Sequence, residues 1–185
     1  GVLGDVIFKN WRVEDLTSMG DQFTNHRNGL DFGFSSDPAA LVACHYNTSK
    51  KEIYIYKELY ETGLTNDILA ARVREMIGDD RVVCDSSEPK SIQELSNYQV
   101  RAAGAVKGKD SVNFGIDWLK QQTIIIDTHC INFQNEIQQY HWKKDAGGNS
   151  LKIPVDKNNH LLDALRYAFE GDMSGSWWMS GGSAT

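Results

Sequence analysis

The sequence predicts one mixed α/β domain, in which three antiparallel strands are followed by parallel strands and helices cover the faces of the sheet. Strand-like segments with a period of two come first in the chain, and short apolar strands then alternate with helical segments. The chain has 185 residues, of which 41% are hydrophobic. This is enough to build one hydrophobic core.

The first 28 residues contain no long periodic segment. We expect them to form an arm that ends a linker from another domain, with Val6, Ile7, Phe8 and Trp11 docking on the main body. The domain itself is then expected to span residues 29–172.

Three strands are expected to open the domain, at residues 29–34, 39–47 and 52–61. In the first of them, apolar residues alternate with Asp31 and Gly33, which is the period of a strand. The polar residues 47–51 suit a hairpin connection between the other two.

Helices and strands are expected to alternate after this point. The predicted helices cover residues 65–77, 89–98 and 111–121, and each precedes a predicted strand, at 81–85, 100–106 and 123–126. Such alternation implies parallel strands joined by crossover helices.

The last part of the chain predicts two more helices and a hairpin. The helices cover residues 133–142 and 159–169, and the glycine-rich residues 147–149 form a turn between hairpin segments 140–143 and 151–153. Residues 173–185 are small and polar around Trp177 and Trp178, so we expect a flexible tail there.

Bulk properties exclude several classes of protein. The chain has no apolar run long enough to span a bilayer and no secretory pattern, so a cytoplasmic protein without membrane contact is expected. Its three cysteines are widely spaced within apolar runs, which indicates structural thiols and no zinc site. The net charge of −6 argues against a domain that coats nucleic acid by bulk attraction.

Three aspartates and one histidine are the candidate catalytic and metal-binding residues. Asp31 lies within an apolar strand, where an unpaired charge is costly unless a cation or another partner balances it. Asp85 ends the apolar run 82–84 at the carboxyl edge of a predicted parallel strand, where ligand sites of α/β sheets gather. His160 and Asp163 lie one turn apart on the polar face of the final helix.

If that helix face looks at the sheet edge, three carboxylates and an imidazole converge into a site for Mg²⁺ or Mn²⁺. Two such ions are expected, in a site that hydrolyses phosphodiesters. Taken singly, each aspartate also suits a turn, a cap or a solvated helix face. Asp37, before Pro38, is typical of a turn start, although its closeness to Asp31 permits it to orient a metal ligand.

Two pairs of lysines are candidates for DNA binding. Lys107 and Lys109 lie in a glycine-containing loop between a predicted strand and helix, but its spacing departs from that of a P-loop, so we expect a contact to DNA phosphate and no nucleotide site. Lys143 and Lys144 lie on the predicted hairpin, where they suit either a DNA backbone or plain solvent exposure.

Four segments together carry a family resemblance: LDFGF at 30–34 with the following Asp37 and Pro38, VCDS at 83–86, KGKDS at 107–111, and DKNNHLLDALRY at 156–167. Over roughly residues 25–170, the chain resembles the C-terminal nuclease domain of the large terminase subunit of tailed bacteriophages. The resemblance implies an RNase H-like fold and two-metal cleavage of double-stranded DNA. Its role would be to cut concatemeric viral DNA during genome packaging, in the cytoplasm of the bacterial host.

The resemblance also implies partners. These are an ATPase domain of the same protein, N-terminal to this chain, with the small terminase subunit and the portal. Two alternatives stay open: another RNase H-like nuclease, such as a junction resolvase, and a non-catalytic DNA-packaging assembly module.

Overall fold

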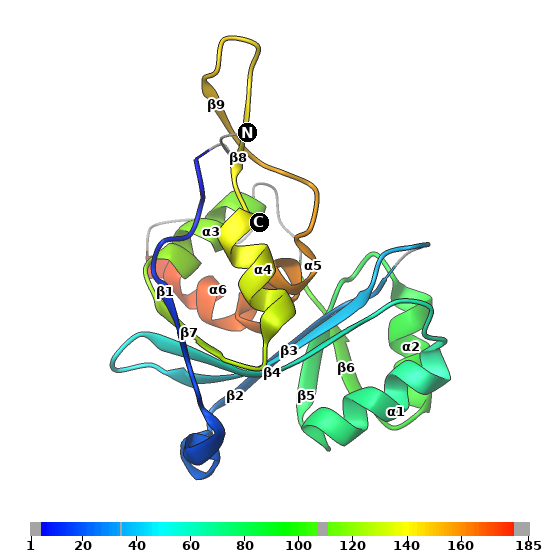
Figure 1. Ribbon diagram of the computed structural model, residues 1–185. Coiled ribbons are helices and arrows are strands. Elements are labelled where there is room, and N and C mark those ends of the chain that lie inside the picture. The colour runs from blue at the N-terminus through cyan, green and yellow to red at the C-terminus, as the bar shows by residue number, and fades with distance from the viewer. Residues whose placement is uncertain (1–4, 34, 107–110, 180–185) are drawn as a thin grey trace.

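A mixed sheet of seven strands forms the centre of the molecule (Figure 1). The computed structural model describes residues 5–33, 35–106 and 111–179, without the side chains of residues 176–179. The strands lie in the order β1-β7-β4-β3-β2-β5-β6. Their bounds are β1 Trp11–Glu14, β2 His26–Asp31, β3 Ala39–Asn47, β4 Glu52–Glu61, β5 Arg81–Cys84, β6 Arg101–Gly104 and β7 Thr123–Asp127.

The strand directions confirm the predicted fold class. β3 is antiparallel to both β2 and β4, whereas the pairs β2–β5, β5–β6, β4–β7 and β1–β7 are parallel. The helices are α1 Asn66–Ile77, α2 Pro89–Asn97, α3 Ser111–Lys120, α4 Ile131–Gln139, α5 His160–Ala168 and α6 Glu170–Met179. A separate hairpin of β8 Trp142–Lys144 and β9 Ser150–Pro154 projects from the body (Figure 1).

The period of two along β3 divides the core into two layers. Ala40 and Val42 face the larger hydrophobic cluster, which α3, α4 and α5 cover, while Leu41 and Ala43 face the cluster under α1 and α2. Figure 1 shows these helix groups on opposite faces of the sheet. The three cysteines are free and buried within the two layers, as the sequence predicts.

The folded domain includes elements within residues 5–28, which corrects the prediction that it begins at residue 29. Trp11–Glu14 form the edge strand β1 in parallel register with β7, a 3-10 helix follows at Thr17–Gln22, and β2 begins at His26. The expected docking of Ile7 and Phe8 is confirmed, because both side chains are buried. No periodic pattern marks β1, since four residues at a sheet edge are too few to show one.

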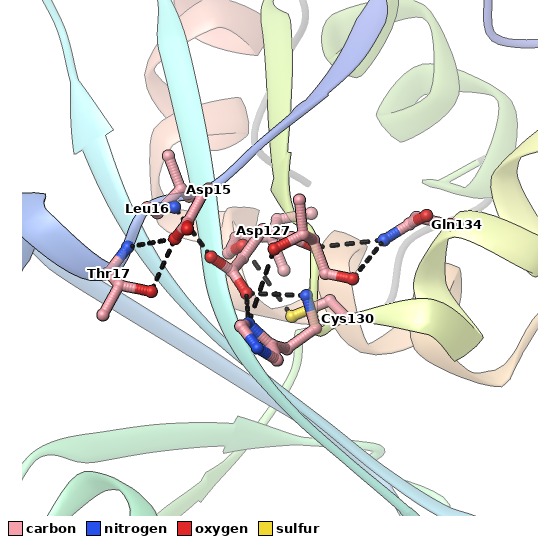
Figure 2. Close-up of polar contacts among 9 residues, drawn as sticks. Asp15, Leu16, Thr17, Asp127, Cys130 and Gln134 are labelled. Atoms are coloured by element: carbon pink, nitrogen blue, oxygen red, sulfur yellow. Dashed lines mark hydrogen bonds and ion pairs between the residues drawn. The ribbon is translucent and has the colours of Figure 1, made fainter.

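Asp127, at the carboxyl end of β7, fastens this arm to the sheet (Figure 2). Its Oδ1 accepts a hydrogen bond from the backbone N–H of Leu16 at 2.8 Å, and its Oδ2 accepts from the backbone N–H and the ring Nδ1 of His129 at 2.8 and 2.9 Å. Three such bonds lower the pKa of this carboxyl despite the opposing effect of burial, which is the largest single contribution.

The tail predicted from residue 173 is also wrong for residues 173–179, which continue helix α6. Three contacts of the described residues help to hold this helix. The Met173 side chain is buried in the larger cluster, and the Asp172 carboxylate accepts two hydrogen bonds from the Arg27 guanidinium, at 2.9 and 3.1 Å. Oε1 of Glu170 accepts a hydrogen bond from the backbone N–H of Val106 at 2.7 Å. Residues 180–185 lie outside the described part of the chain. Within the described ranges, no helix combines the length and apolar character that a membrane crossing requires.

Candidate metal centre

A cavity of about 390 Å³ opens where β2 and β5 end and α5 begins. The parallel pairing of Leu30 with Cys84 brings the next residues, Asp31 and Asp85, to the same sheet edge. Six of the ten residues that line the cavity are acidic, and none is Lys or Arg. The lining residues are Asp31, Phe32, Asp37, Asp85, Ser87, Glu88, Asp156, Asn159, His160 and Asp163.

All four predicted metal-site residues therefore line one cavity. The polar face of α5 is turned toward the sheet edge. The sequence alone does not determine the orientation of this face, and the predicted convergence depends on it. Asp31 is the last residue of β2 and not an interior position, because the strand runs from His26 to Asp31 instead of 29–34. Asp31 is nevertheless buried, with only 8% of the residue exposed.

The Asp31 carboxylate is paired with His160. The ring Nδ1 of His160 donates a hydrogen bond to Oδ2 of Asp31 at 3.1 Å, and the other ring nitrogen lies 3.6 Å from Oδ1 of Asp37. Burial raises the pKa of Asp31, with His160 opposing the shift. The hydrogen bond to Asp31 raises the pKa of His160, and the negative charge of Asp37 adds a smaller raising effect.

Asp163 is paired with an arginine one turn further along α5. The Arg166 guanidinium donates a hydrogen bond to Oδ1 of Asp163 at 2.9 Å. Burial raises the pKa of this carboxyl too, against the lowering effect of Arg166 and with a smaller raising effect from Asp31. The negative charges of Asp31 and Asp163 therefore interact.

Asp85 forms a turn at the end of β5. Its backbone N–H donates to the Leu30 carbonyl at 3.2 Å, which continues the pairing of β5 with β2. Its Oδ1 accepts from the backbone N–H of Ser87 at 2.9 Å. The negative charge of Asp85 contributes to the raised pKa of Asp31, so the two carboxylates interact.

The donor set fits a hard divalent cation. Carboxylate oxygens and one imidazole are ligands that Mg²⁺ and Mn²⁺ accept, and a bound cation would offset both the burial of the Asp31 and Asp163 carboxylates and the smaller repulsion between them. Across the described residues, no three His, Cys, Asp or Glu side chains already surround a single point. Asp31 is turned to His160 and Asp163 to Arg166, so a metal would draw these carboxylates from their present partners.

The close approach of α5 to the sheet depends on Gly29. A Cβ atom built on this residue of β2 would lie 1.8 Å from the Ala164 carbonyl oxygen of α5. Only glycine permits this distance, which sets the depth at which His160 and Asp163 stand beside Asp31.

The two predicted DNA-binding lysines that the structure describes do not line the cavity. Lys143 and Lys144 lie exposed on β8, in the hairpin. Lys107 and Lys109 lie outside the described residues. Among the lining residues that the sequence does not predict as site residues are three with carboxylate or amide side chains: Glu88, Asp156 and Asn159. They precede helices, where acidic and amide side chains usually indicate only a cap.

The comparisons with known proteins place this geometry in a family. The family described as Terminase RNAseH like domain matches residues 31–171. The solved nuclease domain of g2p, the large terminase of bacteriophage SPP1, with bound Mn, superposes with a TM-score of 0.85 at 37% identity, over 90% of this chain and 99% of that one.

Two curated relatives agree. The large terminase subunit of Bacillus phage SPP1 is 38% identical over 178 residues, which is 92% of this chain and 42% of that protein. The PBSX phage terminase large subunit of Bacillus subtilis is 32% identical over 146 residues, 78% of this chain and 34% of that protein. The chain thus spans less than half the length of these relatives, but the family match covers most of its own length, and it belongs to the terminase RNase H-like domain family.

Proposed function

We propose that this chain is the endonuclease domain of a large terminase subunit, which hydrolyses phosphodiester bonds of double-stranded DNA with Mg²⁺ or Mn²⁺. The observation that carries the proposal is the convergence of Asp31, Asp85, Asp163 and His160 in one acidic cavity. The bound Mn in the similar SPP1 nuclease domain supports a divalent cation here.

Each site residue has a role that follows from its surroundings. Asp31, Asp85, Asp163 and His160 would hold the metal ions, two of which are expected, and these would activate the attacking water and stabilise the leaving oxygen. In the structure, His160 donates to Asp31 and so orients that carboxylate toward α5. Arg166 donates a hydrogen bond to Asp163 and so orients the second carboxylate.

The biological role is proposed from the relatives. We infer that the domain cuts concatemeric viral DNA during genome packaging, in the cytoplasm of the bacterial host. The curated relatives are more than twice as long as the region matched in this chain, which leaves room for an ATPase domain in the same protein. The small terminase subunit and the portal are the further proposed partners.

A plasmid-cleavage assay tests the proposal. Wild-type protein with Mn²⁺ or Mg²⁺ is expected to nick or linearise supercoiled DNA, and Asp31→Asn is expected to abolish this while the circular dichroism spectrum stays unchanged. Asp79→Asn provides a matched control, because Asp79 is exposed and does not line the cavity.

Cleavage by Asp31→Asn at the wild-type rate would overturn the site assignment. A wild type that cleaves no DNA with either metal would favour the assembly module. Preferential cleavage of four-way junctions over linear duplex would favour a resolvase.

A further inference from the structure

Two glutamates cap helices to which they do not belong. Glu58 of β4 accepts hydrogen bonds from the backbone N–H groups of Asn132 and Phe133, at 3.1 and 2.8 Å, at the start of α4. Glu136 of α4 in turn accepts from the backbone N–H groups of Leu161 and Leu162, at 2.9 and 3.1 Å, at the start of α5. Two carboxylates therefore connect these elements one after the other: Glu58 joins the sheet to α4, and Glu136 joins α4 to α5.

The cap on α5 replaces a local one. Asn159 occupies the N-cap position, but its side chain makes no capping hydrogen bond. The first backbone N–H groups of a helix have no partner within the helix, and a charged acceptor there also interacts favourably with the helix dipole. Glu136 meets both needs from a position 25 residues away from Leu161.

The position of Glu136 is costly for a carboxylate. Only 3% of the residue is exposed, and among the described residues its Oε2 has no hydrogen-bond partner. Burial raises its pKa to about 7. The two backbone hydrogen bonds at the start of α5 offset part of this cost.

The two capped groups stand between the two site residues of α5. His160 directly precedes Leu161, and Asp163 directly follows Leu162. A shift of this first turn would move both side chains relative to Asp31, which belongs to the sheet.

We infer, on the basis of the proposed function, that Glu136 is a positioning residue for the metal site: it fixes the first turn of α5 and thereby the places of His160 and Asp163 opposite Asp31. Glu136 does not line the acidic cavity, so its effect on the site passes through α5. Residues that orient metal ligands from outside typically change metal affinity or activity by about 10- to 100-fold when they are replaced.

Calorimetric titration of the chain with Mn²⁺ tests the inference without any reliance on cleavage. Glu136→Leu is expected to lower the Mn²⁺ affinity by about 10- to 100-fold, because both N–H groups lose their acceptor. Glu136→Gln keeps one acceptor oxygen for them, so we expect it to restore most of the affinity.

Ile137→Ala is the matched control. Ile137 is the next residue of α4 and is fully buried, but it makes no capping bond. This variant is expected to melt at a lower temperature and to bind Mn²⁺ as the wild type does.

The outcomes separate the possible explanations. Wild-type affinity in Glu136→Leu would overturn the inference, as would an equal loss in Ile137→Ala, which would indicate general destabilisation. An equal loss of Mn²⁺ affinity in Glu136→Gln would also overturn the inference, because it would show that the negative charge of Glu136, and not its capping hydrogen bonds, determines the affinity. If Glu136→Leu does not fold, Glu136→Asp replaces it, since the shorter side chain withdraws the carboxylate from the cap and should still lower the affinity. A wild type that binds no Mn²⁺ would refute the proposed metal site itself.

Discussion

Replacing Gly29 by alanine tests how closely α5 must pack on the sheet. The added Cβ would meet three backbone atoms of α5: the Ala164 oxygen at 1.8 Å, the Ala164 carbonyl carbon at 2.8 Å and the Ala168 nitrogen at 2.9 Å. Ordinary contact begins at 3.4 Å, so the helix would have to retreat by about 1.6 Å along the shortest of these lines. No flexible side chain is present at these atoms to absorb the clash.

Retreat of α5 would disturb the core and the site together. Leu161 and Leu165 are fully buried against the sheet, so the movement would open gaps beneath them. Overpacking of a core typically costs about 1–3 kcal/mol, and Gly29→Ala should lie near the upper end because all three atoms that it meets are backbone atoms. A displacement of about 1 Å at a catalytic site can lower the rate by about 100-fold.

We therefore expect Gly29→Ala to fold with a free energy of unfolding lower by about 3 kcal/mol, and to cleave plasmid about 100-fold more slowly. Urea denaturation followed by circular dichroism gives the first quantity and a nicking assay the second.

Gly171→Ala in α6 is the control. A Cβ there meets nothing within 4 Å, and alanine should gain up to about 1 kcal/mol of helix propensity. An unfolding free energy for Gly29→Ala within about 0.5 kcal/mol of the wild type, together with full cleavage, would refute the reasoning.

Three further predictions concern stability and DNA binding. The pKa of Glu136 is raised to about 7 in the folded protein, so the folded state binds this proton more tightly than the unfolded chain does. Without divalent metal, the contribution of the bound proton to the free energy of unfolding is therefore complete below pH 4.5 and is lost as the pH rises to about 7. Relative to Glu136→Gln, the wild type should lose about 3 kcal/mol across this range in urea melts, and parallel pH profiles would contradict the pKa shift. Phe169→Ala should lower the unfolding free energy by about 3–5 kcal/mol because the ring is fully buried, and a loss below about 1 kcal/mol would show that the site collapses around the missing ring. Replacing both Lys143 and Lys144 by alanine should reduce the slope of the logarithm of the DNA-binding constant against the logarithm of the salt concentration, by the amount expected for the loss of about two phosphate contacts. An unchanged slope would show that the hairpin does not contact DNA.

Much of the fold follows from local patterns. The alternation along β3 predicts which residues face each helix layer, because the period of a strand leaves no other arrangement. The apolar stripe of α5, including Leu161 and Leu165, likewise predicts that His160 and Asp163 share the opposite face.

The parts that the sequence missed depend on distant contacts. The hydrogen bond that fastens the arm joins Leu16 to Asp127, 111 residues apart, and no local pattern indicates such a pairing. The residues around Trp177 have the composition of a tail, but Arg27 and the core hold the start of α6 in place. In the sequence, Glu136 is indistinguishable from an exposed polar residue of an amphipathic helix. Its burial arises only when the whole domain has folded.

The edge position of β1 limits where a shortened form of the domain can begin. A fragment that begins at residue 29 would lack β1 and would leave one side of β7 unpaired. The strand contains three consecutive isoleucines, Ile124 to Ile126. Its unpaired backbone N–H and C=O groups would then be free to pair with a strand of another chain. Such a fragment should aggregate through strand addition, whereas one that begins before Asp5 keeps the edge covered and should remain monomeric at the same concentration.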